Sequence, residues 1–215
     1  MKHDRIAEFI QSFDPGNNDF LNSLEERARR DNIPVIRPAA QNLLKLMLEL
    51  KRPGSILEVG AAIGFSAVFM AQYSDPSARI TTIEKYEKRL GPLKENILAS
   101  GFKDRIRVIE GDALEVLKEL SDEGASFDFI FMDAAKGQYL NFLPYVLKLL
   151  PEGGVLISDN VLQDGDIIES RFAVERRNRT IHSRMREYLY QLTNGGELVT
   201  GIFPIADGMT VSVRR

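Results

Sequence analysis

The 215-residue sequence contains no cysteine, and its only histidines are His3 and His182. Without cysteine the chain forms no disulfide, has no thiolate nucleophile and offers no cysteine ligand for zinc. Two histidines are too few for a multi-histidine metal site within one chain. Any metal site must therefore be built from oxygen ligands, which favour hard cations such as Mg²⁺.

Long apolar runs and a large net charge are also missing. No apolar run reaches the length of a membrane span, and the N-terminal residues lack the apolar core of a secretory signal. We therefore expect a cytoplasmic protein with no membrane partner, and the lack of cysteine is compatible with that compartment. The net charge of −3 gives no overall attraction to nucleic acid.

Short apolar segments alternate with longer amphipathic ones from residue 55 onward, which is typical of βαβ units. The predicted strands are residues 55–60, 79–84, 105–111, 127–133 and 153–160. Two further strand-like segments, joined around Asp207 and Gly208, predict a C-terminal antiparallel hairpin. We therefore predict an α/β fold with a seven-stranded, mostly parallel sheet and helices on both faces. Residues 1–52 form a predicted N-terminal helical cap and residues 53–215 a Rossmann-like core, within a single domain.

A glycine-containing turn, "EVGAAIGFS" (58–66), follows the first predicted strand. Glu84 ends the second strand, where an acid can accept hydrogen bonds from both hydroxyls of a ribose. The turn departs from the dinucleotide pattern G-x-G-x-x-G because Ala62 and Phe65 stand at the second and third glycine positions. This favours a nucleoside cofactor without a pyrophosphate, such as S-adenosylmethionine. The alternative is a plain tight turn beside a surface acid.

Oxygen-bearing side chains end the fourth and fifth predicted strands. Asp133 ends the fourth strand, and Asp159 and Asn160 end the fifth. In a doubly wound sheet, ligands bind at the carboxyl ends of the strands, so we expect these side chains to converge there. Two carboxylates and an amide suit an octahedral Mg²⁺ site. Alternatively, Asp159 and Asn160 form only a turn after the strand.

The segments "ILEVGAAIGFSA", "MDAAKGQY" and "ISDNV" resemble the metal-dependent class I O-methyltransferases of the catechol and caffeoyl-CoA type. The resemblance covers roughly residues 33–161 and implies a Rossmann-like class I methyltransferase fold. It implies two cofactors, S-adenosylmethionine and Mg²⁺ (or Mn²⁺). It also implies a metal site of Asp133, Asp159 and Asn160. Asp133 and Lys136 are the predicted catalytic residues, with Lys136 as the base; the alternative for Lys136 is a solvated surface lysine. The predicted cofactor-binding residues are Ile36, Glu58, Gly60, Gly64, Ser66, Glu84, Asp112, Ala113 and Asp133.

Residues 170–187 carry six arginines and only two glutamates. The whole chain is also similar to bacterial tRNA 5-hydroxyuridine methyltransferases, which form 5-methoxyuridine at the wobble position. This resemblance implies tRNA as the substrate. We predict that the phosphates of its anticodon loop contact Arg171, Arg176, Arg177, Arg179 and Arg184. The alternative is a solvated helix face in an enzyme that methylates a small molecule such as a catechol.

Two further expectations concern partners and class. The apolar faces of the N-terminal helices either cover the cofactor site or pair with a second subunit, and the family resemblance favours a homodimer. A nicotinamide-dependent oxidoreductase or a plain nucleotide-binding module is a less favoured reading, because the glycine pattern departs from the dinucleotide fingerprint.

Overall fold

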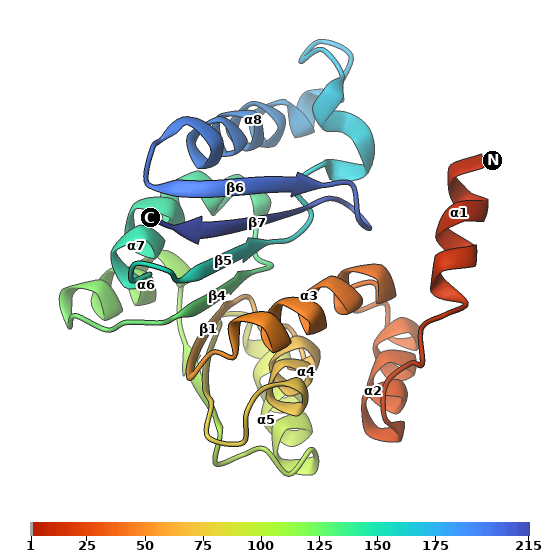
Figure 1. Ribbon diagram of the computed structural model, residues 1–215, viewed down its shortest axis with the longest axis vertical. Coiled ribbons are helices and arrows are strands. Elements are labelled where there is room, and N and C mark those ends of the chain that lie inside the picture. The colour runs from red at the N-terminus through yellow and green to blue at the C-terminus, as the bar shows by residue number, and fades with distance from the viewer. Residues whose placement is uncertain (1) are drawn as a thin grey trace.

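A computed structural model of the chain describes residues 2–215, apart from the side chains of residues 2–4, 7 and 164. Seven strands form one sheet in the order β3-β2-β1-β4-β5-β7-β6 (Figure 1). The strands are β1 (Ser55–Val59), β2 (Arg79–Glu84), β3 (Ile106–Glu110), β4 (Phe129–Met132), β5 (Val155–Ser158), β6 (Leu198–Phe203) and β7 (Met209–Arg214). The first five pair in parallel, and β7 pairs antiparallel with both β5 and β6. The predicted mixed sheet with a C-terminal hairpin is confirmed.

Eight α-helices and three short 3₁₀-helices are found in the described part of the chain. The α-helices are α1 (Lys2–Gln11), α2 (Asp19–Arg30), α3 (Pro38–Lys51), α4 (Phe65–Tyr73), α5 (Glu87–Ala99), α6 (Ala113–Asp122), α7 (Tyr139–Leu149) and α8 (Arg179–Asn194). The 3₁₀-helices are η1 (Lys136–Gln138), η2 (Gln163–Ile168) and η3 (Arg176–Asn178). None of these helices is both long and apolar enough to cross a membrane.

The sheet separates two hydrophobic cores. Adjacent residues of a strand point to opposite faces, so Ile56 packs into a core with residues of α2 to α5, whereas Leu57 packs into a core with residues of α6 to α8. The central strands β4 and β5 are buried along their whole length because helices cover both faces. Their carboxyl ends are thereby held rigidly side by side.

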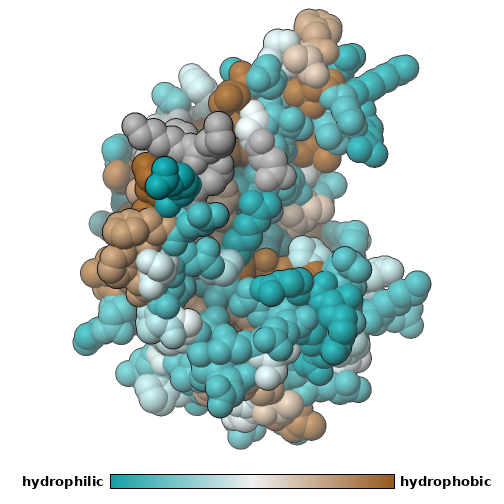
Figure 2. All heavy atoms as spheres, turned by 90° about the vertical axis from the view of Figure 1, so that its right-hand side faces the viewer, coloured by the Kyte–Doolittle hydropathy of each residue, from teal (hydrophilic) through white to brown (hydrophobic). Residues whose placement is uncertain are grey.

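The N-terminal helices differ in how they are anchored. Asn18 caps α2 by accepting a 2.9 Å hydrogen bond from the backbone N–H of Leu21, and Pro38 begins α3. In Figure 1, α1 stands away from the sheet at the right of the view. Its large apolar side chains and the following Phe13 are 52–72% exposed. The side of the molecule seen in Figure 2 is mostly hydrophilic, with hydrophobic patches among the polar side chains.

Candidate active site

A cavity of about 710 Å³ lies at the carboxyl ends of the parallel strands. The position is the expected one, because β1 lies between β2 and β4 and the order of strands therefore reverses beside it. Seven of the predicted site residues line the cavity: Gly60, Glu84, Asp112, Ala113, Asp133, Lys136 and Asn160. They come from the last residue of β2 and from the segments that follow β1, β3, β4 and β5, so the fold joins predicted cofactor, metal and catalytic residues in one space.

Gly60 lies where the turns after β1 and β4 meet. Its φ is +102°, and a Cβ at this position would stand 2.2 Å from the carbonyl oxygen of Asp133. Only glycine fits this contact without displacing the backbone. The glycine of this turn therefore joins the cofactor side of the cavity to the strand that carries Asp133.

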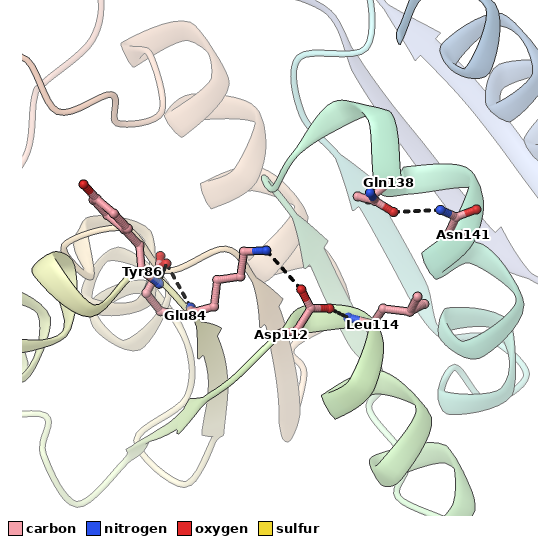
Figure 3. A network of polar contacts seen from close by, with 7 residues as sticks. Glu84, Tyr86, Asp112, Leu114, Gln138 and Asn141 are labelled. Atoms are coloured by element: carbon pink, nitrogen blue, oxygen red, sulfur yellow. Dashed lines mark hydrogen bonds and ion pairs between the residues drawn. The ribbon is translucent and has the colours of Figure 1, made fainter. Parts of the chain in front are cut away.

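Glu84 is held at the end of β2 by three backbone N–H groups, and Figure 3 labels Glu84 together with one of the donors, Tyr86. Ala62 donates to Oε2 over 2.8 Å, and Lys85 and Tyr86 donate to Oε1 over 3.0 and 2.8 Å. A carboxylate has about four acceptor directions, so roughly one remains for a ligand. The Ala62 contact ties the acid to the glycine turn and fixes its carboxylate beside the cavity.

Asp112 caps the helix that follows β3. Its Oδ1 accepts a 2.9 Å hydrogen bond from the backbone N–H of Leu114, and its Oδ2 lies 3.0 Å from Nζ of Lys85 (Figure 3). The hydrogen bond from Lys85 is the main cause that lowers the pKa of Asp112. Figure 3 also labels Gln138 and Asn141, from the segment after β4, and Gln138 lines the same cavity. The predicted cofactor-binding role of Asp112 stays a prediction.

Four predicted cofactor residues do not line the cavity. Ile36 is part of the buried core, Gly64 packs against Leu93, and Glu58 and Ser66 are buried. Burial is the main cause that raises the pKa of Glu58 to about 7. Thr82 donates a hydrogen bond to Oε2 of Glu58, and Oε1 has no hydrogen-bond partner among the described residues. The roles implied for these four residues by the family resemblance remain predictions.

The three predicted metal ligands lie together. Nδ2 of Asn160 is 3.5 Å from Oδ1 of Asp133, and the backbone N–H of Asn160 donates to Oδ1 of Asp159 over 2.7 Å. Asn160 has a φ of +61°, a left-handed conformation that asparagine tolerates better than most residues. The segment is thus a turn, as the alternative reading had it, and also brings the two ends of β4 and β5 together.

The donor chemistry fits a hard divalent cation. Among the described side chains no three of His, Cys, Asp and Glu form a metal-binding group, so the candidate set is two carboxylates and one amide. Burial raises the pKa of Asp133 to about 6 and that of Asp159 to about 7, and the charge of Asp133 adds to the effect on Asp159. Two buried carboxylates that repel one another are stabilised by a cation between them. The amide of Asn160 can turn its oxygen toward the same point.

Lys136 has a partner that the sequence did not reveal. Its Nζ lies 3.1 Å from Oδ2 of Asp207, which is at the tip of the β6–β7 hairpin. The sequence assigned Asp207 only to the hairpin turn, which is the ordinary role of an Asp-Gly pair. The hairpin tip is therefore part of the candidate site.

Tyr139 is a second residue that sequence reasoning missed. Its buried hydroxyl donates toward the carbonyl oxygens of Met132, 3.1 Å away, and Asp159, 3.0 Å away. These carbonyls belong to the ends of β4 and β5, so one hydroxyl links the two strand ends that carry the predicted metal ligands. Tyr139 is the third residue after Lys136, but nothing in that spacing indicates which carbonyls the hydroxyl reaches.

Most of the arginines of residues 170–187 make contacts within the chain. Arg179 donates to the carbonyl oxygens of Val174 and Phe172, and Arg186 donates to that of Ile167. Arg184 donates to the carbonyl oxygen of Gly137 over 2.9 Å and so links α8 to the turn that carries Lys136. Arg177 pairs with Glu175. The remaining two, Arg171 and Arg176, have no polar partner among the described residues and are exposed.

Comparisons with known proteins identify a family and a shared fold. A family model described as O-methyltransferase matches residues 12–215. A catechol O-methyltransferase of Niastella koreensis is 31% identical over 62% of this chain and 61% of its own length. A catechol O-methyltransferase of Mycobacterium tuberculosis is 29% identical over 76% of this chain and 74% of its own length. Among solved structures, the O-methyltransferase of Bacillus cereus in complex with SAH superposes with a TM-score of 0.85 at 24% identity, covering 98% and 97% of the two chains.

The match over residues 12–215 includes all of the sheet and nearly all of the helices. The chain therefore belongs to the O-methyltransferase family. The match with the Niastella koreensis relative spans less than two thirds of either chain. The solved structures below 25% identity support the fold.

Proposed function

We propose that the chain is an S-adenosylmethionine-dependent O-methyltransferase that acts on small molecules with two adjacent oxygens, of the catechol or caffeoyl type. The proposal rests mainly on one observation. A single cavity is lined by Gly60, Glu84 and Asp112 together with Asp133, Asn160 and Lys136. Its volume of about 710 Å³ is in the range typical of small-molecule sites. The catechol O-methyltransferases among its relatives and the SAH complex of the Bacillus cereus enzyme support the proposal.

Each part of the cavity has a role in the proposed reaction. S-adenosylmethionine supplies the methyl group, and a divalent cation held by Asp133, Asp159 and Asn160 would stabilise the acceptor as an oxyanion. Glu84 binds a ribose hydroxyl at its remaining acceptor position and fixes the cofactor. Lys136, as the neutral amine, takes the proton of the acceptor hydroxyl at Nζ and becomes the ammonium that pairs with Asp207. The rigid ends of β4 and β5 align the acceptor oxygen with the methyl group, which contributes through orientation.

The test is methyl transfer from S-adenosylmethionine to catechol and to caffeoyl-CoA, with and without Mg²⁺, followed by mass spectrometry of the products. We expect product with Mg²⁺ and a loss of at least about 100-fold after chelation. The Lys136→Ala variant is expected to lose a similar factor, because general-base catalysis contributes about 100-fold or more. Undiminished turnover after exhaustive chelation contradicts the metal-assisted mechanism.

A second candidate acceptor is 5-hydroxyuridine at the wobble position of tRNA, methylated to 5-methoxyuridine. The observation that favours it is the pair Arg171 and Arg176, which are exposed and without polar partners among the described residues. A hydroxyl beside a carbonyl in 5-hydroxyuridine presents two adjacent oxygens, as a catechol does. The acceptor chemistry at the strand ends is therefore the same for both candidates.

The two candidates separate in one competition assay that contains catechol and tRNA bearing 5-hydroxyuridine. If tRNA is the substrate, 5-methoxyuridine is formed, and Arg171→Ala with Arg176→Ala weakens tRNA binding and flattens its dependence on salt. The matched control is Arg29→Ala with Arg30→Ala on α2, two exposed arginines next to acidic partners. Turnover of catechol alone, with no change in tRNA binding for either pair of variants, excludes the tRNA reading.

We also propose that α1 pairs with a second copy of the chain. Ile6, Phe9, Ile10 and Phe13 are exposed on or just after α1, which stands away from the sheet (Figure 1). Large apolar side chains grouped on one helix are a common mark of an interface. Sedimentation of the wild-type chain should give a dimer, and Phe9→Glu with Phe13→Glu should give a monomer. A wild-type monomer at micromolar concentration contradicts the pairing.

A further inference from the structure

The tip of the β6–β7 hairpin lies against the segment that carries Asn160. The backbone N–H of Leu162 donates to the carbonyl oxygen of Asp207 over 2.9 Å, and that of Val161 donates to Gly208 over 3.0 Å. Two consecutive backbone hydrogen bonds therefore fix Asp207 relative to the end of β5. The hairpin is distant in sequence from β4, but its tip lies beside the carboxyl ends of β4 and β5.

Gly208 makes this approach possible. Its φ is +84°, and a Cβ there would lie 2.2 Å from Cγ of Leu162. Any larger residue would push the tip away from the segment after β5. The Asp-Gly pair thus does more than turn the chain, because glycine brings the hairpin close enough for the aspartate to reach the site.

The carboxylate of Asp207 points to Lys136. Its Oδ2 lies 3.1 Å from Nζ, the Asp207 side chain is 5% exposed and the Lys136 side chain is 32% exposed. An ion pair in this position loses less strength to solvent than one at the surface. A lysine has a long, flexible side chain, so a single fixed partner decides where its nitrogen lies.

We propose that Asp207 is a positioning residue, which holds Nζ of Lys136 at the end of β4, beside Asp133 and in the candidate cavity. The inference rests on the proposed function for the role of Lys136 and adds a residue that acts through it. The hairpin tip, fixed by Val161, Leu162 and Gly208, is the rigid support for Asp207. Lys136 belongs to the segment after β4, but its side chain is held by the tip of the β6–β7 hairpin. The fold of this hairpin therefore sets where Nζ of Lys136 points.

A double-mutant cycle tests whether Asp207 acts through Lys136. With the acceptor that the wild-type chain methylates, Asp207→Ala should lower kcat about 10- to 100-fold, because a displaced catalytic group costs rate more than binding. The KM for S-adenosylmethionine should change less than about twofold, and Asp207→Glu should restore part of kcat. In a Lys136→Ala background the Asp207→Ala change should cost less than about twofold. Equal costs in both backgrounds overturn the proposal.

A second measurement does not depend on turnover. In ¹⁵N-lysine-labelled protein, an ion-paired ammonium exchanges its protons slowly enough to give a cross-peak, and Lys136→Met identifies the peak of Lys136. We expect this peak in the wild type and its loss in Asp207→Asn. The peak of Lys94, which pairs with Glu110 on the surface, serves as the control and should be unaffected.

The two measurements separate the inference from the proposed function. If neither acceptor is methylated, the proposed function fails, and the cross-peak still decides whether Asp207 holds Lys136. A missing Lys136 peak in the wild type, or a peak that survives Asp207→Asn, overturns the positioning role whatever the acceptor is.

Discussion

The candidate site has a cofactor half and an acceptor half, and their acidic side chains differ in how their charge is compensated. On the cofactor half, Glu84 accepts three backbone N–H groups, and Asp112 accepts one backbone N–H and the ammonium of Lys85. On the acceptor half, Asp133 and Asp159 have pKa values raised to about 6 and about 7, mainly by burial. The first pair of acids is compensated by the protein itself. The second pair is compensated only in part, by the backbone N–H of Asn160 at Asp159 and by the charge of Lys136 near Asp133.

The difference follows from where each acid stands. Glu84 and Asp112 lie at the starts of turns that lead into helices, where free backbone N–H groups are available. Asp133 and Asp159 end the buried strands β4 and β5, where the neighbouring backbone is already paired in the sheet. Compensated acids provide a preformed surface for hydrogen-bonding a neutral diol. Buried acids that are only partly compensated would be stabilised by a bound cation.

The largest expected effect is at the acceptor half. Asp159→Ala or Asp159→Asn should lower the rate of methyl transfer by at least about 1,000-fold, since a bound metal contributes several kcal/mol to the transition state. Mn²⁺ binding, followed by electron paramagnetic resonance, should be lost, while the affinity for S-adenosylhomocysteine in calorimetry changes less than about threefold. Asp122→Ala, an exposed acid on α6, is the control. Equal loss of both affinities contradicts a metal role confined to one half.

The next largest expected effect is on stability, at Gly60, where the cofactor half and the acceptor half meet. Gly60→Ala should lower the free energy of unfolding by about 3 kcal/mol, which combines the cost of a positive φ with overpacking against the carbonyl of Asp133. Gly124→Ala isolates the first cost, because Gly124 has a φ of +72° and nothing within 4 Å of its added Cβ. We expect about 1 kcal/mol there by urea denaturation. Equal losses in the two variants indicate that the contact with β4 is not a tight one.

A third expected effect is a pH dependence of stability that comes from the buried Glu58. The pKa of Glu58 is raised from 4.5 to about 7 by burial, so the folded state holds its proton more tightly than the unfolded state does. Its contribution to stability is fully present below pH 4.5 and is lost as the pH rises to about 7. The loss is roughly 3 kcal/mol at most.

The Glu58→Gln variant measures this contribution. The difference in unfolding free energy between wild type and variant should change in the variant's favour from pH 5 to pH 8. Glu119→Gln, at an exposed position of α6, should show no such trend. A difference that is independent of pH shows that Glu58 ionises as readily in the folded chain as in the unfolded chain.

Part of the candidate site could be predicted from the sequence alone. The strand ends could be predicted because apolar segments and chain order determine which edge of a parallel sheet each one faces. Glu84, Asp133 and Asn160 were therefore expected at one edge, and all three line the cavity. Family resemblance, and not periodicity, suggested Ile36, Glu58 and Ser66, and the structure leaves these three out of the cavity wall.

What the sequence could not reveal depends on contacts between distant elements. Asp207 reaches Lys136 only because the hairpin folds back onto residues 161 and 162, and Asp-Gly is already explained by a turn. Tyr139 reaches two carbonyls on different strands, which no local pattern encodes. Likewise, arginine count suggested a phosphate surface, whereas Arg179, Arg184 and Arg186 donate to backbone carbonyls.

The smallest effect tests whether the halves are independent. Glu84→Gln replaces one acceptor oxygen by an NH₂ group that opposes the backbone N–H donors around it. We expect the affinity for S-adenosylhomocysteine to fall about 10- to 100-fold, as for the loss of one charge-assisted hydrogen bond. Mn²⁺ affinity should stay within about twofold. Glu115→Gln, on the wall of the same cavity, is the matched control and should change neither affinity.

If Mn²⁺ affinity falls together with cofactor affinity, the backbone contacts of Glu84 also support the metal edge through the turn at Gly60. The two halves then form one cooperative unit, and the contrast in how their acids are compensated does not separate their functions.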